Sequence, residues 1–398
     1  MMRLKYLARL VADKTVPGNG RPHIDLENVQ SGGTMAFSYS ADTDGRGESL
    51  LAQRGDVLIS KLRPYLRKVL VAPEELTCSG EFLVLRPRHA VDPRFLAHVL
   101  ASVPVTNHLV SRSYGTKMPR ASWSDLGEFR VQTLSIDEQR AVARRLEEES
   151  AQVSTLVTRI DRLRAVTREA AMRYVDDALS ARPATNRRLR FGLHAIQQGW
   201  SPECDDRPAE PGEWGVLKLG CVNYAVFRPD EHKALPKGVT PRPQLEVRPG
   251  DLLISRANTR ALVGSAAIVR DWRPRLMLSD LLYRLVLDAD VWHPPYVEAV
   301  LNSPLGRQQI EAAASGSAGS MPKISQAIIS NLTIPHLPLP DQIQVADMIS
   351  GKRAADARID RRMEAMREAV IEYRDALAAE LLFGSTPAPV FAAEEAVA

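Results

Sequence analysis

The sequence predicts an α+β fold: two tandem mixed α/β domains, separated and joined by two long helices that form an antiparallel coiled coil. Three observations support this prediction. Short motifs occur twice in the same order, each copy begins with β-branched runs between turn residues, and each copy ends in a stretch with helical periodicity. The chain is therefore predicted to be an internal repeat with a pseudo-two-fold relation between its halves.

The repeat is visible in motifs along the whole chain. GDVLIS begins at Gly55 and GDLLIS at Gly250, so the offset is 250 − 55 = 195. MPRAS (118–122) matches MPKIS (321–325), and LSIDEQRAVA (134–143) matches LPLPDQIQVA (337–346), both at an offset of 203. RIDR (159–162) returns at 358–361, an offset of 199. Matches in one order at a slowly drifting offset indicate duplication of a whole domain, because solenoid repeats are only about 20 to 50 residues long.

The predicted domain boundaries follow from these motifs. The first domain covers 1–137, a central long helix 138–182, a linker and second domain 183–340, a C-terminal long helix 341–383, and a disordered tail 384–398. The basic segment 181–190 is the expected linker. Helices are expected at 92–102 and 294–303, and strands at 57–60, 81–87, 129–134, 251–255, 283–289 and 332–337.

Each long helix has a narrow apolar stripe with alternating spacings of three and four, which is typical of a coiled-coil seam. Two helices docked separately on their own domains are the alternative, which the length and narrowness of the stripes disfavour. Pro183 closes the first helix and Gly384 follows the second. The predicted seams are Leu156, Ile160, Leu163, Thr167, Ala170, Tyr174, and then Ile359, Met363, Met366, Val370, Tyr373, Leu377.

Composition and missing motifs exclude several classes of function. The net charge is 52 − 48 = +4, which permits a polyanionic partner without requiring one. Three cysteines without a CxxC pair make a disulfide framework or a zinc site improbable. There is no membrane-length apolar run, so we expect a soluble cytoplasmic protein. No P-loop, HExxH, GxSxG or glycine-rich cofactor loop is present, so we expect no metal, no cofactor and no catalytic residue in this chain.

The sequence HPPY (293–296) is close to a motif of amino-methyltransferases. Its counterpart in the first copy is DPRF (92–95), and both stand before the same helical pattern. Proline is favoured in the first turn of a helix because its missing N–H is not needed there. The sequence therefore favours a helix start over a catalytic motif.

Two segments in each copy are candidates for contact with a nucleic acid. After each GD strand comes a polar, basic segment that differs between the copies although the strand is retained, and arginine, lysine and asparagine are the side chains that reach base edges or phosphates. A second pair of short glycine-containing segments, 111–120 and 315–323, ends in Arg120 and in Lys323. A solvated surface loop is the simpler alternative for each segment. The candidate residues are Lys61, Arg63, Tyr65, Arg67, Lys68, Tyr114, Lys117 and Arg120, and then Arg256, Asn258, Thr259, Arg260, Ser320 and Lys323.

These motifs resemble those of the specificity subunit of type I restriction-modification systems. The resemblance covers Met1 to Gly384 and depends on the GD(V/L)LIS strand with its basic successor, the MPxxS segment, and the DEQ and PDQ starts of the long helices. It implies two target recognition domains, each reading half of an asymmetric bipartite DNA site, and helices that set the spacer. It also implies two modification (methyltransferase) subunits that carry S-adenosylmethionine, restriction/translocase subunits, and no catalysis in this chain.

Two other functions stay open at this point. The first is a protein-binding scaffold without nucleic acid, which the modest net charge favours and the basic segments disfavour. The second is a self-sufficient methyltransferase, which the missing cofactor loop disfavours.

Overall fold

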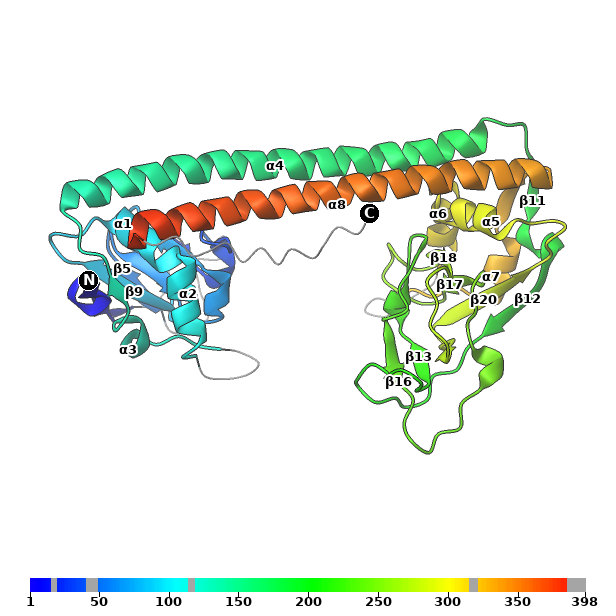
Figure 1. Ribbon diagram of the computed structural model, residues 1–398, viewed down its shortest axis with the longest axis horizontal. Coiled ribbons are helices and arrows are strands. Elements are labelled where there is room, and N and C mark those ends of the chain that lie inside the picture. The colour runs from blue at the N-terminus through cyan, green and yellow to red at the C-terminus, as the bar shows by residue number, and fades with distance from the viewer. Residues whose placement is uncertain (16–19, 41–48, 114–118, 315–320, 385–398) are drawn as a thin grey trace. The chain divides into compact units, whose positions relative to one another are not determined.

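The structure is a computed structural model that describes residues 1–15, 20–40, 49–113, 119–314 and 321–384. The chain divides into two compact units (Figure 1). Unit 1 contains 1–162 with 363–398, and unit 2 contains 163–362. Each unit therefore combines one globular part with one stretch of each long helix. The predicted tail, apart from Gly384, lies outside the described residues.

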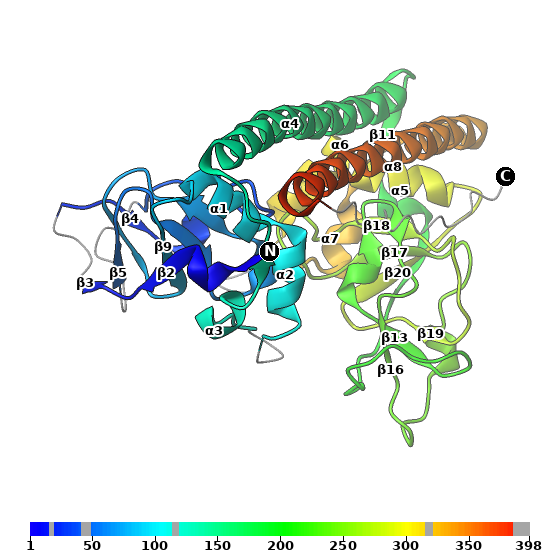
Figure 2. The ribbon, with the colours of Figure 1, turned by 60° about the vertical axis from the view of Figure 1, so that its left-hand side comes forward.

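The globular part of unit 1 contains two four-stranded sheets and short helices (Figure 2), and α1 packs against β6 and β7 of the first sheet. The first sheet has the order β2-β9-β6-β7 and is antiparallel, and the second has the order β3-β5-β8-β4 with β4 parallel to β8. Their bounds are β2 Ala8–Val11, β9 Phe82–Pro87, β6 Val57–Ser60, β7 Val69–Val71, β3 Lys14–Thr15, β5 Ser49–Ala52, β8 Leu76–Ser79 and β4 His23–Ile24. The short strands β1 (Met2–Arg3) and β10 (Arg130–Val131) pair separately, and the helices are α1 Pro93–Ala101, α2 Val103–Val110 and α3 Trp123–Leu126.

Unit 2 repeats the first sheet of unit 1 with the order β12-β20-β17-β18. Its strands are β12 Leu193–Gln198, β20 Leu282–Leu287, β17 Leu252–Ser255 and β18 Ala266–Ile268. A second sheet contains β16 (His232–Ala234), β13 (Gly215–Leu217) and β19 (Leu276–Met277), and β14 (Val222–Asn223) pairs with β15 (Val226–Phe227). The helices are α5 Pro294–Asn302, α6 Pro304–Ala313 and α7 Gln326–Asn331. Pro93 and Pro294 each occupy the first turn of a helix, as the repeat predicts.

The GD motif has the same structural role in both units. Gly55 and Gly250 have φ values of +87° and +90°, which a residue with a side chain rarely adopts. The following aspartate then pairs with an arginine on the neighbouring strand. Asp56 accepts two hydrogen bonds from Arg86 at 2.7 and 2.8 Å, and Asp251 accepts one from Arg284 at 2.8 Å. The motif therefore fixes the turn before the buried strand.

The segment predicted as a plain linker differs from that expectation. Thr185–Arg188 forms strand β11, which pairs with β21 (Thr333–His336) in an antiparallel ladder, and Leu189 is fully buried. The composition of this basic segment does not predict a strand, because a short edge strand needs few apolar residues.

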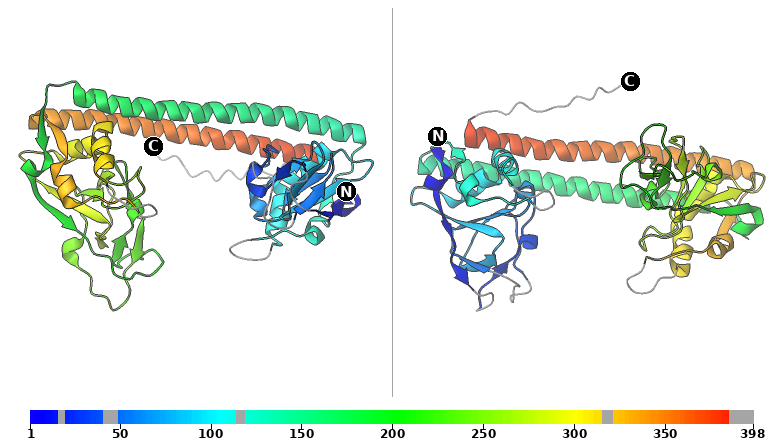
Figure 3. Two further views of the ribbon diagram at one scale, coloured as in Figure 1. Left: turned by 180° about the vertical axis from the view of Figure 1, so that it is seen from behind. Right: turned by 90° about the horizontal axis from the view of Figure 1, so that it is seen from below.

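The long helices are α4 (Ile136–Ser180) and α8 (Leu339–Phe383), each unbroken (Figure 3). Two ion pairs in unit 2 show that the helices run antiparallel. In unit 1, Asp161 pairs with Arg367 at 3.4 Å. In unit 2, Arg164 pairs with Asp360 at 2.8 Å, and Arg182 with Asp341 at 3.0 Å. The predicted antiparallel coiled coil is thus confirmed. Gly384 ends α8 with a left-handed φ of +67°.

The predicted seam is correct at half of its positions. Ile160, Thr167, Tyr174, Met363, Val370 and Leu377 are sheltered, whereas Leu156, Leu163, Ala170, Ile359, Met366 and Tyr373 are exposed. Charged residues stand at the intervening seam positions, among them Arg164, Asp360 and Arg367. The prediction followed apolar side chains, and it therefore mixed the seam with a neighbouring exposed row.

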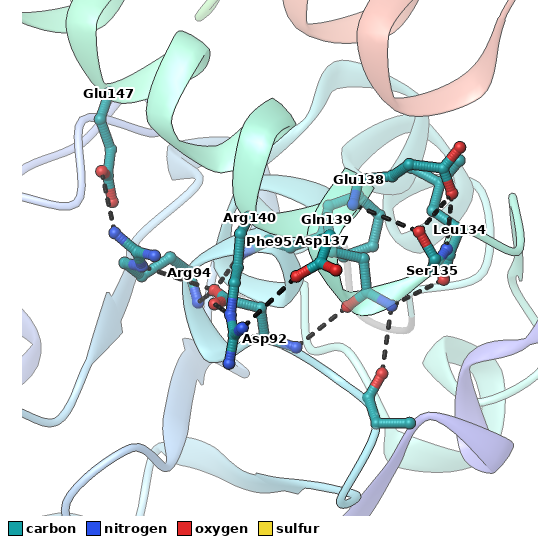
Figure 4. Close-up of polar contacts among 11 residues, drawn as sticks. Asp92, Arg94, Phe95, Leu134, Ser135, Asp137, Glu138, Gln139, Arg140 and Glu147 are labelled. Carbon is teal, nitrogen blue, oxygen red and sulfur yellow. Dashed lines mark hydrogen bonds and ion pairs between the residues drawn. The ribbon is translucent and has the colours of Figure 1, made fainter.

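A buried glutamine joins each long helix to its globular part, and Figure 4 shows Gln139, the one at the start of α4. The side-chain oxygen of Gln139 accepts from the N–H of Asp92 at 2.9 Å, and its amide donates to the carbonyls of Ala90 and Leu134 at 3.1 and 3.0 Å. In unit 2, Gln342 accepts from the N–H of His293 at 2.9 Å and donates to two carbonyls in the same way. The glutamine of the DEQ and PDQ motifs thus sets the start of each helix relative to its domain.

Candidate nucleic-acid interface

The two candidate segments of unit 1 lie side by side. Leu62 forms an isolated antiparallel bridge with Arg120, the N–H of Arg63 donates to the carbonyl of Pro119 at 2.8 Å, and the N–H of Ala121 donates to the carbonyl of Lys61 at 2.8 Å. We call 61–68 together with 119–120 the first loop pair. Segments more than fifty residues apart in the sequence thus form one surface.

Unit 2 builds the same arrangement. Ala257 forms a bridge with Lys323, and the N–H of Ile324 donates to the carbonyl of Arg256 at 2.9 Å. We call 256–260 together with 321–323 the second loop pair. The bridge residues follow the repeat, since 257 − 62 = 195 and 323 − 120 = 203. The chain therefore presents two equivalent loop pairs with different side chains.

The exposed side chains of the first loop pair are Arg63, Tyr65 and Arg120. Arg63 and Arg67 have left-handed φ values of 51° and 52° and flank the 3-10 turn Pro64–Leu66, in which Tyr65 is half exposed. Arg120 donates to the carboxylate of Glu81 at 2.8 Å but keeps 58% of its side chain exposed. This surface combines two cations and an aromatic ring, which are groups that can contact phosphates and bases.

Three other candidates of the first loop pair have their charged ends occupied by protein groups. Lys61 donates to the carbonyl of Gly80 and Lys68 to that of Leu26, both at 2.6 Å. Arg67 donates to the carbonyl of Ala101 at 2.8 Å and forms a two-bond ion pair with Asp375 of α8, at 2.5 and 2.9 Å. These residues fix the loop. Any contact of theirs with DNA stays a prediction.

The second loop pair likewise contains both exposed side chains and side chains that bond to protein groups. Thr259, Arg260 and Lys323 are exposed. Arg256 donates to the carbonyl of Asp280 at 3.1 Å, and Asn258 is buried, with its side-chain oxygen accepting from the N–H of Thr259 at 2.8 Å. The remaining candidates, Tyr114, Lys117 and Ser320, lie outside the described residues.

Arg307 of α6 supports the second loop pair, although it is not among the candidate residues predicted from the sequence. Its guanidinium is buried and donates to the carbonyls of Val263, Ala261 and Arg260 at 2.6, 3.1 and 3.4 Å. These bonds hold the end of the segment that carries Thr259 and Arg260. An arginine in a short polar helix gives no sequence signal for such a role, because the same pattern is typical of a solvated face.

The units thus define a class of protein with paired β-rich domains on an antiparallel coiled coil, each domain presenting one loop pair. No family model matches the chain. The specificity subunit of the type I restriction enzyme EcoEI of Escherichia coli is 34% identical over 184 residues, which cover 46% of this chain and 31% of that protein. The EcoDI specificity subunit of Escherichia coli is 28% identical over 107 residues, covering 27% and 24%.

A solved structure described as the structural basis of complex assembly and conformational transition of the type I R-M system matches with a TM-score of 0.67. It is 20% identical and covers 96% of both chains, which supports the fold. The resemblance to type I specificity subunits is therefore confirmed. The matched regions span less than a third of the length of the curated relatives. These relatives do not favour the scaffold without nucleic acid.

Proposed function

We propose that this chain is the DNA sequence-recognition subunit of a type I restriction-modification complex. Each loop pair reads one half of an asymmetric bipartite site in double-stranded DNA. The observation that carries the proposal is the repeated loop pair: the same backbone bridge occurs in both units, while the exposed side chains differ. A common scaffold with different exposed groups suits two readers of different sequences.

The exposed row beside the seam supports a second part of the proposal, the docking of two modification subunits. In unit 1 this row includes Leu156, Met366 and Tyr373, and in unit 2 it includes Leu163, Val166 and Ile359. Apolar side chains that line up on an exposed helix face mark surfaces for protein contact. Restriction/translocase subunits complete the assembly in this proposal.

The proposal assigns methyl transfer, and the S-adenosylmethionine it needs, to the modification subunits, and assigns neither catalysis nor a cofactor to this chain. Among the described residues, no helix is long and apolar enough to cross a bilayer. We therefore place the complex in the cytoplasm, where it meets DNA.

The test begins by identifying the target through base-resolution methylation of host DNA with and without this chain. The assembled complex is then bound to a duplex with that site. Arg63→Ala and Arg260→Ala should each weaken binding, and each lost phosphate contact should reduce the slope of log K against log salt by about 0.9. Exposed arginines outside the loop pairs, Arg54→Ala and Arg248→Ala, are the matched controls.

The outcome separates the two loop pairs. If a variant loses sequence preference rather than affinity, its side chain reads a base, and the change should be confined to one half-site. Equal affinity and an equal salt slope in all four variants would remove the loop pairs from the DNA interface.

A further inference from the structure

A cavity of about 830 Å³ lies in unit 1, and none of its lining residues belongs to the first loop pair. It is bordered by the 30–36 segment, α1, α4 and α8. Its apolar wall includes Met35, Val153, Val157 and Ile371. Its volume is in the range of sites for small organic ligands, which have apolar walls and few polar groups.

His98 of α1 lines this cavity with its polar group unused. The side chain is 7% exposed, and its Nε2 atom has no hydrogen-bond partner among the described residues. A buried polar atom without a partner is costly, at about 1–3 kcal/mol, so most such atoms have one. The Nε2 atom has almost no surface open to the cavity, so a polar group of a ligand reaches it after a small rotation of the His98 ring.

The same region of unit 2 shows which chemistry suits this place. There the buried carboxylate of Glu298 on α5 accepts from the N–H of Ile268 at 2.7 Å. Arg270 and Arg353 donate to it at 3.1 and 3.2 Å. The carboxylate thus caps the outward N–H of the edge strand β18.

In unit 1, the positions that correspond to Glu298, Arg270 and Arg353 carry uncharged residues. By the repeat offsets, Glu298 corresponds to Ala97 (298 − 201) and Arg353 to Ser150 (353 − 203), and Arg270 corresponds to Pro73 (270 − 197). Ser150, and Ser154 one turn later, both line the cavity. Small residues therefore leave space where unit 2 has an ionic cluster.

The backbone donor is retained in unit 1. Ile268 corresponds to Val71 of the edge strand β7, since they pair with Leu252 and Val57 in the same register. The N–H of Ala72 donates to the carbonyl of Asp56, so the alternation of the antiparallel ladder turns the N–H of Val71 outwards. No described residue is assigned as its acceptor, and Val71 lines the cavity.

We propose that this cavity binds a small monocarboxylic acid with an apolar body. Its carboxylate accepts from the N–H of Val71 and bonds to His98, and its apolar part lies against Val153, Val157 and Ile371. The lining also contains Arg94, Arg367 and Arg374 together with Glu147. Each arginine also has an ion pair: Arg94 with Asp92 and Glu147, Arg367 with Asp161 and Glu364, and Arg374 with Asp375. The carboxylate is thus recognised by hydrogen bonds, and binding should depend only weakly on salt.

This proposal does not rest on DNA recognition, so its test contains no DNA. Octanoate and 4-phenylbutyrate are titrated into the full-length protein, followed by calorimetry and by NMR of ¹⁵N-labelled histidine. The amides of both acids are the neutral controls. We expect both acids to bind and to shift the His98 ring signals, and we expect the amides to bind at least about tenfold more weakly.

Variants locate the site. Ser154→Trp fills the cavity from α4 and should abolish binding, whereas Thr155→Trp, the adjacent exposed position outside the cavity lining, should not. His98→Phe keeps the ring and should weaken the acids by about tenfold or more, because a hydrogen bond to a charged group is lost. Circular dichroism of each variant checks that the protein is folded.

Two results would overturn the proposal. One is that neither acid binds at millimolar concentration. The other is binding that Ser154→Trp leaves unchanged. If no acid binds but Ser154→Trp blocks assembly with the modification subunit while Thr155→Trp does not, the cavity receives a side chain of that protein, and the small-ligand proposal is wrong.

Discussion

Two arginines four residues apart, Arg63 and Arg67, show how the same side chain takes opposite roles in one loop. Arg63 is exposed beside the bridge to Arg120, whereas the guanidinium of Arg67 is sheltered between the carbonyl of Ala101 and the carboxylate of Asp375. The sequence shows only two basic residues in a polar segment. Their roles differ because the folded chain brings α8 against one of them.

The difference predicts separate effects on stability. Arg67→Ala removes two hydrogen bonds to Asp375, which keeps its ion pair with Arg374, and should lower the free energy of unfolding by about 2 kcal/mol. Arg63→Ala removes an exposed side chain and should change it by less than about 0.5 kcal/mol. Denaturant unfolding of both variants checks this. Equal stabilities would show that the ion pair with α8 contributes little.

His98 predicts a dependence of stability on pH. The pKa of His98 is lowered from 6.5 to about 4: burial is the largest cause, the charge of Arg94 acts in the same direction, and Asp92 opposes both. Between pH 6.5 and pH 4 the unfolded chain takes up a proton that the folded protein does not, so stability is complete above pH 6.5 and falls as the pH decreases. The loss is on the order of 3 kcal/mol. His98→Phe should remove this part of the pH dependence, which is measured by denaturant unfolding at pH 7 and pH 4.

At the scale of elements, Gln139 and Gln342 are the joints between globular parts and long helices. Replacing Gln139 by leucine keeps the volume but removes the partner of one backbone N–H and two carbonyls, and the N–H belongs to the buried residue Asp92. We expect a loss of about 3 kcal/mol in the free energy of unfolding. Gln152→Leu, at an exposed position of the same helix, is the control and should be nearly neutral. A similar loss in both variants would contradict the role of the joint.

Strands and short helices were largely predictable because buried apolar runs and turn residues are local signals. β6, β9, β17, β20, α1 and α5 all lie where the repeat and its β-branched runs place them. Strand β11 was missed, since its pairing with β21 depends on residues about 150 positions away. The seam of the helices was half predicted, because Arg164 and Asp360 satisfy each other across it and no apolar pattern records such a pair.

The candidate site shows the same limit. The loop pairs were predictable as segments because they differ between two copies of one scaffold. Which of their side chains are exposed was not predictable, since Lys61, Lys68 and Asn258 bond to backbone groups that only the fold brings close. Arg307 was missed for the same reason: its partners are carbonyls of a loop more than forty residues away.

For the whole molecule, the proposed function implies that the long helices set the distance between the two half-sites. The ion pairs give a place to change the length of the helices: Asp161 pairs with Arg367 in unit 1, and Arg164 pairs with Asp360 in unit 2. Four residues inserted after Arg162 in α4, together with four after Arg362 in α8, fall between these pairs and leave both intact. The helices then gain about 6 Å, with a rotation of about 40° beyond a full turn.

DNA rises about 3.4 Å and turns about 35° per base pair, so this change is worth one or two base pairs. We expect base-resolution methylation by the doubly inserted protein to show unchanged half-sites and a spacer longer by one or two. The insertion in α4 alone moves Arg164 one turn past Asp360 and breaks the pairing, so it should reduce assembly of the complex. An unchanged spacer at full activity in the double insertion would show that the helices do not set the distance, because helices that set it would separate the half-sites further when lengthened.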